Sequence, residues 1–174
     1  MGKASDAVDV LNQALDIYRR IGGHVDDIED IEMIKDELHV DISELLISRE
    51  KVLEAEGYYS DTYHDLTERI YKRYKRDNHI EQAIVEIDRL IDFYVKQTIE
   101  EGTQIWKLEK AYCLYELKPN EKHSNLIDSL FVDYEKMLRE KNEFANSERF
   151  NAFVSYALHK YEIDDYKSAI TWVT

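Results

Sequence analysis

FNAFVSYALHKYEIDDYKSAITWV, residues 150–173, has the hydrophobic pattern of two helices joined by a tight turn. Its first half places apolar and aromatic side chains at helical spacing, at Phe153, Tyr156, Ala157 and Tyr161. Two acidic residues, Asp164 and Asp165, then supply the turn. The second half continues the helical pattern at Tyr166, Ala169 and Trp172. Because the small Ala169 allows two helices to approach closely, the segment predicts a helical hairpin.

Similar openings of a second helix recur upstream of this hairpin. Aligning them on the small or apolar residue before an Ile/Leu pair selects Leu45, Ala83, Leu126 and Ala169. The spacings between these residues are 38, 43 and 43 residues, which is typical of repeated helical hairpins. One hairpin cannot bury its apolar face alone, so successive hairpins are expected to stack.

Hydrophobic periodicity covers nearly the whole chain and predicts nine helices joined by short loops, with no strand. The chain has only 5 glycines and 1 proline, and this shortage of turn residues disfavours a compact β-rich fold. The longest candidate helix is expected to end at Gly102. The predicted helices fall within residues 5–23, 26–38, 41–57, 61–78, 80–102, 103–117, 123–142, 146–163 and the segment that follows Asp164.

The charge of the chain limits its partners. Its 174 residues include 37 acidic and 23 basic residues, a formal net charge of −14. Such a surface repels phosphate groups, which argues against direct nucleic-acid binding and against docking on anionic membranes. No apolar run reaches membrane-spanning length, and the single cysteine, Cys113, lies among apolar neighbours and is expected to be buried. We therefore expect a cytoplasmic protein.

The hairpin at 150–173 resembles a tetratricopeptide repeat, in which a tight turn joins helix A to a helix B that opens with large, small and aromatic residues. The resemblance extends over 103–174, although the family's usual helix-A Trp, its Gly and its closing Pro are absent. It implies antiparallel hairpins stacked as a right-handed superhelix, with N-terminal helices over 1–57 and repeats over 58–174. Because the last repeat is incomplete, we expect the natural chain to continue past Thr174 or a partner to hold this helix.

The same resemblance implies a groove, lined by helix-A residues, that binds a protein or a short peptide. The family's register places the groove residues at Lys72, Lys75, Tyr115, Lys118, Asn151, Leu158 and Tyr161. Amides could pair with a peptide backbone, lysines could meet its carboxylates, and tyrosines would supply contact area.

A dense group of basic residues lies in TERIYKRYKRDN, residues 67–78. Arg69, Lys72, Arg73 and Arg76 follow one stripe of a helix. This stripe could be an anion patch for an acidic peptide, a terminal carboxylate or a phosphate. Alternatively, it is a solvated stripe paired with neighbouring acids, and the surplus of acidic residues favours this second interpretation.

The segment IEMIKDELHVDISELL, residues 31–46, resembles the closing helices of a Cro/repressor-type helix-turn-helix domain. The matching residues are Leu38, Val40, Glu44, Leu45 and Leu46, while the residues before them are acidic and provide no convincing recognition helix. Peptide-sensing regulators of Gram-positive bacteria join such a domain to tetratricopeptide-like repeats that bind a signalling peptide and dimerise. The resemblance thus implies the sensing and oligomerisation part of a bacterial transcriptional regulator, which could be a homodimer.

Two further resemblances remain as alternatives. TQIWKLEKAYCLYELK, residues 103–118, together with the final hairpin resembles the core of the mitochondrial fission adaptors, which are anchored by a C-terminal membrane helix. Arg19 and His24 have the spacing of the catalytic pair in helical ribonucleases of the HEPN type, but two glycines interrupt the helix between them. The sequence contains no motif for catalysis, metal binding or phosphate binding, so we expect a non-catalytic protein without a cofactor.

Overall fold

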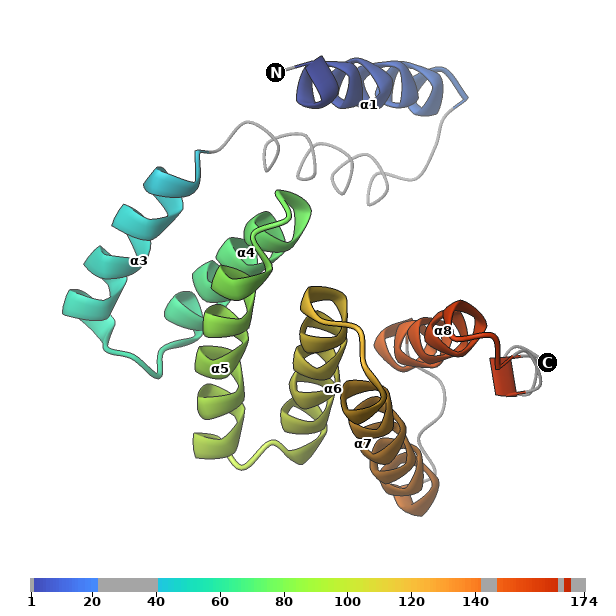
Figure 1. The fold of residues 1–174 in the computed structure, drawn as a ribbon. Coiled ribbons are helices and arrows are strands. Elements are labelled where there is room, and N and C mark those ends of the chain that lie inside the picture. The colour runs from blue at the N-terminus through green and yellow to red at the C-terminus, as the bar shows by residue number, and fades with distance from the viewer. Residues whose placement is uncertain (1, 22–40, 142–146, 166–167, 170–174) are drawn as a thin grey trace. The chain divides into compact units, whose positions relative to one another are not determined.

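The computed structural model describes residues 2–21, 41–141, 147–165 and 168–169. These residues contain seven α-helices and no strand, which confirms the predicted all-α class (Figure 1). The helices are α1 (Gly2–Ile21), α3 (Ile42–Glu56), α4 (Asp61–Arg76), α5 (Ile80–Lys96), α6 (Glu100–Leu117), α7 (Glu121–Lys141) and α8 (Ser147–Glu162). Nine helices were predicted; the one at 26–38 lies outside the described residues, and the last one lies largely outside them.

The chain divides into two compact units, Met1–Ser48 and Arg49–Thr174. The sequence-based division places this boundary later, between residues 57 and 58. Helix α1 belongs to the first unit, α3 begins in the first unit and ends in the second, and α4 to α8 belong to the second.

Three turns of the second unit share one backbone geometry. In each, a residue with positive φ follows a helix: Asn78 (φ 60°), Thr98 (φ 57°) and Asp164 (φ 63°). The next residue donates its amide to a carbonyl five residues earlier, at 2.8 Å from His79 to Tyr74, 2.9 Å from Ile99 to Tyr94 and 2.9 Å from Asp165 to Lys160. This is a Schellman-type helix end, which satisfies carbonyls that the helix leaves unpaired. The tight acidic turn predicted at Asp164 is confirmed.

The predicted helix over 80–102 is wrong at its C-terminal end. Helix α5 ends at Lys96 and α6 begins at Glu100, so Gly102 lies in the first turn of α6. A Cβ atom on Gly102 would be only 2.2 Å from Cδ1 of Tyr94. This glycine therefore permits close packing against Tyr94 rather than ending a helix, and a sequence pattern does not distinguish these two uses of glycine.

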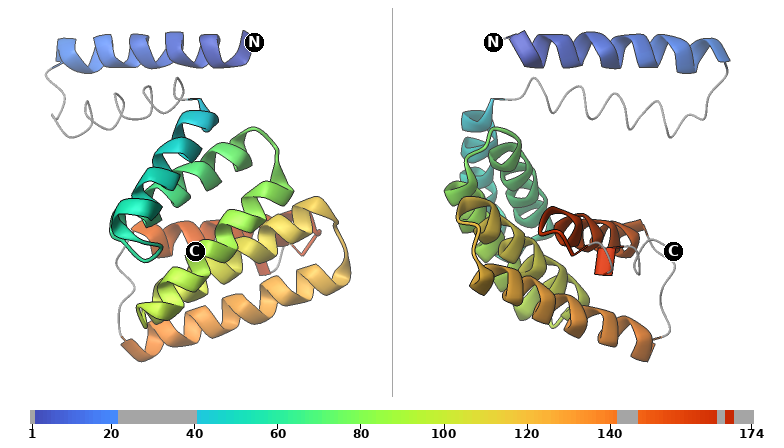
Figure 2. Two further views of the ribbon diagram at one scale, coloured as in Figure 1. Left: turned by 90° about the vertical axis from the view of Figure 1, so that its left-hand side faces the viewer. Right: turned by 45° about the vertical axis from the view of Figure 1, so that its right-hand side comes forward.

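Helices α4, α5, α6 and α7 pack in chain order, each against the next (Figure 2). One core cluster, shared by α4, α5 and α6, contains Tyr71, Ile80, Ala83, Ile87, Leu90 and Cys113. A second cluster joins α8 to α6 and α7 and contains Leu108, Ala111, Ile127, Phe131 and Tyr156. In it the rings of Phe131 and Tyr156 stack with centroids 3.8 Å apart. The expected burial of Cys113 is confirmed, since its side chain is fully buried.

Buried positions of α3, α5 and α7 recur every 41 residues. Two such series are Leu45, Glu86 and Ile127, and Arg49, Leu90 and Phe131, all of them buried. Two turn residues with positive φ, Gly57 and Thr98, are also 41 residues apart. The predicted alignment is wrong at two positions: it pairs Leu45 with Ala83, 38 residues away, and it uses Leu126, which exposes 39% of its surface while its neighbour Ile127 is fully buried. The repeat is therefore more regular than the predicted spacings indicate.

Candidate functional site

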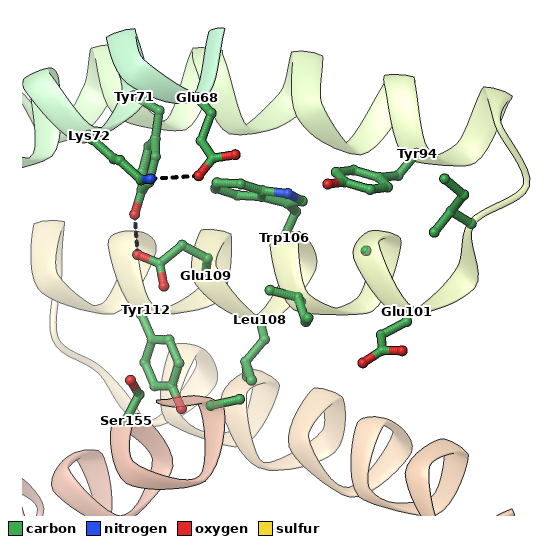
Figure 3. Close-up of a pocket in the computed structure, with 14 residues that line it drawn as sticks. Glu68, Tyr71, Lys72, Tyr94, Glu101, Trp106, Leu108, Glu109, Tyr112 and Ser155 are labelled. Atoms are coloured by element: carbon green, nitrogen blue, oxygen red, sulfur yellow. Dashed lines mark hydrogen bonds and ion pairs between the residues drawn. The ribbon is translucent and has the colours of Figure 1, made fainter. Parts of the chain in front are cut away.

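A pocket of about 580 Å³ opens on the side of the second unit formed by α4, α6 and α8 (Figure 3). Helix α6 contributes half of the described lining residues, namely Glu101, Gly102, Ile105, Trp106, Leu108, Glu109 and Tyr112. The others are Glu68, Tyr71 and Lys72 from α4, Tyr94 and Ile99 from the end of α5 and its turn, and Ala152 and Ser155 from α8. The contributions of α6 recur every three or four residues, so one face of this helix forms about half of the wall.

Aromatic side chains of the pocket lie between α4 and α6. The rings of Tyr71 and Trp106 meet edge to face, with centroids 5.1 Å apart and planes at 90°. The hydroxyl of Tyr71 donates a hydrogen bond to Glu109. Burial, followed by the charge of this carboxylate, raises the pKa of Tyr71 far above its usual value. The phenol therefore stays protonated and holds Glu109 in place.

Charged side chains of the pocket are mostly acidic. Three glutamates and one lysine are among its described lining residues. Lys72 Nζ lies 2.7 Å from Glu68 Oε1, one turn earlier on α4. Glu101 lies in the first turn of α6, where the helix dipole stabilises a carboxylate. The lining therefore has an excess of negative charge.

Tyr112 forms the part of the wall next to α8. Its hydroxyl is buried and has no hydrogen-bond partner among the described residues. Burial, followed by the charge of Glu109, raises the pKa of Tyr112, so the phenol keeps its proton. Its ring lies edge-on to that of His159, with centroids 6.0 Å apart. A buried hydroxyl without an acceptor is a donor that the fold leaves unsatisfied.

The structure places the two predicted lysines of α4 next to each other. Lys72 lines the pocket. Lys75, one turn further along, lies between α4 and α6, where its Nζ donates to Glu116 Oε2 at 2.7 Å and to Cys113 Sγ at 3.4 Å. Lys75 also lies 3.7 Å from Glu109 Oε1.

The other predicted groove residues lie elsewhere. The ring of Tyr115 packs edge-on against His159, with centroids 4.7 Å apart. Lys118 is the exposed residue after α6, and near the end of α8 Tyr161 exposes 62% of its surface and Leu158 57%. Asn151 belongs to α8, but its side chain lies outside the described residues. Tyr115, Lys118 and Tyr161 are not among the described lining residues of the pocket.

Two arginines of the predicted anion patch share one carboxylate. Arg73 Nε lies 2.7 Å from Asp77 Oδ2, and Arg76 Nε lies 3.5 Å from Asp77 Oδ1. Partial burial acts to raise the pKa of Asp77, but hydrogen bonds and charge from both arginines outweigh it and lower the pKa. Arg69 lies one turn earlier on the same helix.

Sequence reasoning missed the aromatic residues of the pocket, although an internal repeat marks them. ERIYKRY at 68–74 and EKAYCLY at 109–115 are 41 residues apart and share Glu-x-x-Tyr-x-x-Tyr. The first motif contributes Glu68 and Tyr71 to the pocket, and the second contributes Glu109 and Tyr112. The groove residues predicted for α6 are counted back from Leu126. Because Leu126 is not at an equivalent position, the count selects Tyr115 and Lys118 at the C-terminal end of this helix instead.

Only one residue of the predicted Arg–His pair lies in the part of the chain that the structure describes. Arg19 is exposed near the end of α1, and His24 lies outside the described residues. No group of three or more described His, Cys, Asp or Glu residues could hold a metal ion. No described helix is both long and apolar enough to cross a membrane. Comparison with protein-family models, curated proteins and solved structures finds no match.

Proposed function

We propose that the second unit is a tetratricopeptide-like module that binds a peptide segment of a protein partner in the pocket between α4, α6 and α8. The main support for this proposal is that α4, α6 and α8 all contribute to the wall of the pocket. They are the first helices of successive hairpins, and in stacked hairpins of this kind the first helices face the ligand. The pocket volume of about 580 Å³ suits a few side chains of a bound segment.

The repeat of 41 residues supports this proposal. Stacked repeats present equivalent residues along one face, and an extended face of this kind can recognise an extended chain. Here the equivalent pairs are Glu68 with Glu109 and Tyr71 with Tyr112, and all four line the pocket. Tyrosine and tryptophan, which dominate protein-binding sites, make up much of the wall.

A selection from a random peptide library displayed on phage tests this proposal. Ile99 lines the pocket and is 45% exposed, while Val85 on α5 is 53% exposed and is not among the described lining residues. Serine is a favourable helix cap, so Ile99→Ser at the start of α6 should leave folding intact. Selected peptides should bind Ile99→Ser about fivefold more weakly, a loss of about 1 kcal/mol, and bind Val85→Ser normally. A selection that yields no peptide with this dependence would count against the proposal.

As the wider role, we propose the sensing and oligomerisation part of a cytoplasmic bacterial regulator. The support is the sequence resemblance of 31–46 and of the last hairpin to such regulators. Static light scattering with and without a selected peptide tests this role, because a sensing region should change its association state when it binds. An unchanged mass would favour a simple adaptor over a sensor.

A further inference from the structure

Charge in the pocket favours a cationic ligand over an acidic one. The described lining residues include one base, Lys72, and three acids, Glu68, Glu101 and Glu109. The lysines that could meet a ligand carboxylate already have partners, since Lys72 pairs with Glu68 at 2.7 Å, while Lys75 lies 2.7 Å from Glu116 and 3.7 Å from Glu109. An acidic ligand would have to displace these pairs and would also meet the remaining negative charge.

Aromatic rings in the pocket add to this preference. In Figure 3 the side chain of Trp106 lies between those of Tyr71 and Tyr94, along the same wall as Glu68. The face of an aromatic ring attracts a cation by about 0.5–2 kcal/mol, and tryptophan attracts it most strongly. Carboxylates beside a row of aromatic rings are a combination that binds guanidinium and ammonium groups.

Other parts of the wall indicate that the ligand is more than a cation. The apolar side chains of Ile99, Ile105 and Leu108 also line the pocket, and they would bury an apolar neighbour of the charged group. A peptide supplies both features, because it combines a charged side chain with apolar side chains.

We infer that the pocket binds a peptide segment through an inserted arginine or lysine side chain. This inference rests on the proposed function and specifies the charge of the peptide. The sequence-based interpretation expects a ligand carboxylate, which is negatively charged. The charge of the pocket instead favours a positively charged ligand group. The net charge of −14 would also accelerate the approach of a basic segment.

Three capped tripeptides test this inference: Leu-Arg-Leu, Leu-citrulline-Leu and Leu-Glu-Leu. Citrulline has nearly the shape of arginine but no charge, so this pair isolates the charge. Binding is followed by NMR at the indole N–H of Trp106; the chain has 2 tryptophans, and Trp106→Phe assigns the signal. The arginine peptide should bind about tenfold more tightly than the citrulline peptide, and the glutamate peptide should bind most weakly.

Adjacent glutamates of α6 provide a matched pair of variants. Glu100 and Glu101 both lie in the first turn of α6, but only Glu101 is among the described lining residues. Either substitution by glutamine removes one charge from the same helix end, so their effects on the helix should be similar. Glu101→Gln should weaken the arginine peptide by about three- to tenfold and leave the citrulline peptide unchanged, while Glu100→Gln should change both by less than about twofold.

The outcomes separate this inference from the proposed function. Equal affinities for the arginine and citrulline peptides, or equal effects of the two glutamine substitutions, would overturn the cationic ligand. The cationic ligand would also be overturned if the arginine peptide left the Trp106 signal unchanged while phage-selected peptides still bound in an Ile99-dependent way. If the phage selection yields no Ile99-dependent peptide, peptide binding itself is refuted.

Discussion

Tyr71 on α4 and Tyr112 on α6 occupy equivalent positions 41 residues apart, but only the hydroxyl of Tyr71 has a hydrogen-bond acceptor among the described residues. The acceptor of Tyr71 is Glu109. The residue one repeat after Glu109 is Phe150, which has no acceptor atom in its side chain.

The two tyrosines should therefore respond differently to removal of the hydroxyl. Tyr71→Phe leaves the carboxylate of Glu109 without its donor and should lower the free energy of unfolding by about 1.5–3 kcal/mol. Tyr112→Phe removes a buried hydroxyl that has no acceptor, so it should leave this free energy unchanged or raise it by up to about 1–3 kcal/mol. Urea unfolding followed by circular dichroism measures both, and equal losses would contradict the assignment of partners.

The ion pair of Arg49 and Glu86 should be replaceable by apolar residues. Their side chains are only 4% and 6% exposed, and Arg89 Nε lies 3.4 Å from the same carboxylate. The equivalent positions one repeat later hold Leu90 and Ile127. Glu86→Ile alone should destabilise the protein by about 3–5 kcal/mol, because two arginines lose their anion.

Adding Arg49→Leu to Glu86→Ile should recover most of this loss, since it removes one of the stranded charges. Glu81→Gln, on the exposed side of α5, serves as a control and should be neutral within about 0.5 kcal/mol. Strictly additive losses in the double variant, measured by urea unfolding, would show that the two side chains are not coupled.

Gly102→Ala should destabilise the protein even though alanine favours a helix. The added Cβ would lie 2.2 Å from Cδ1 and 2.8 Å from Cγ of Tyr94, so the whole ring must move. Overpacking of this kind costs about 1–3 kcal/mol, which exceeds the gain of about 1 kcal/mol in helix propensity. In a Tyr94→Ala background the same substitution should be neutral or stabilising, and a destabilisation that persists there would refute the steric cause.

Thr98→Gly should stabilise the protein. Thr98 has φ 57° at the turn position where Gly57 has φ 88° one repeat earlier, and a β-branched residue is strained in this region. Relief of the strain, less the added entropy of the unfolded chain, should raise the free energy of unfolding by about 0.5–1 kcal/mol. Gln97→Gly, at a helical φ of −78°, should instead lower it. A loss of stability in both variants would contradict the strain at Thr98.

His159 should make stability depend on pH near neutrality. Burial, followed by the positive charge of Lys160, lowers the pKa of His159 below its usual value. Its Nε2 lies 3.1 Å from Ser124 Oγ. Below about pH 6.5 the unfolded chain therefore binds more protons than the folded one. The contribution of neutral His159 to the free energy of unfolding is fully present above this pH and is lost as the pH decreases.

The His159→Gln variant removes this titration and should have a flatter stability curve between about pH 7 and pH 5. Urea unfolding at several pH values in this interval compares the two proteins. Parallel curves would show that His159 titrates in the same way in the folded and unfolded states.

The helices of this protein follow from local sequence because helical periodicity and turn chemistry act over a few residues. The acidic turn at Asp164 closes within three residues, and its Schellman hydrogen bond joins positions only five apart. Residue patterns over such distances are visible in the chain itself, which is why the all-α class and most helix bounds could be predicted.

Only the tertiary structure decided the register of the repeat, the use of Gly102 and the residues of the pocket. These depend on contacts between residues far apart in the chain, such as Tyr71 with Glu109 and Lys75 with Glu116. Whether Leu126 or Ile127 faces the core depends on a rotation of α7 that local periodicity allows either way. Packing of neighbouring helices selects one rotation of α7, because it buries the larger apolar area.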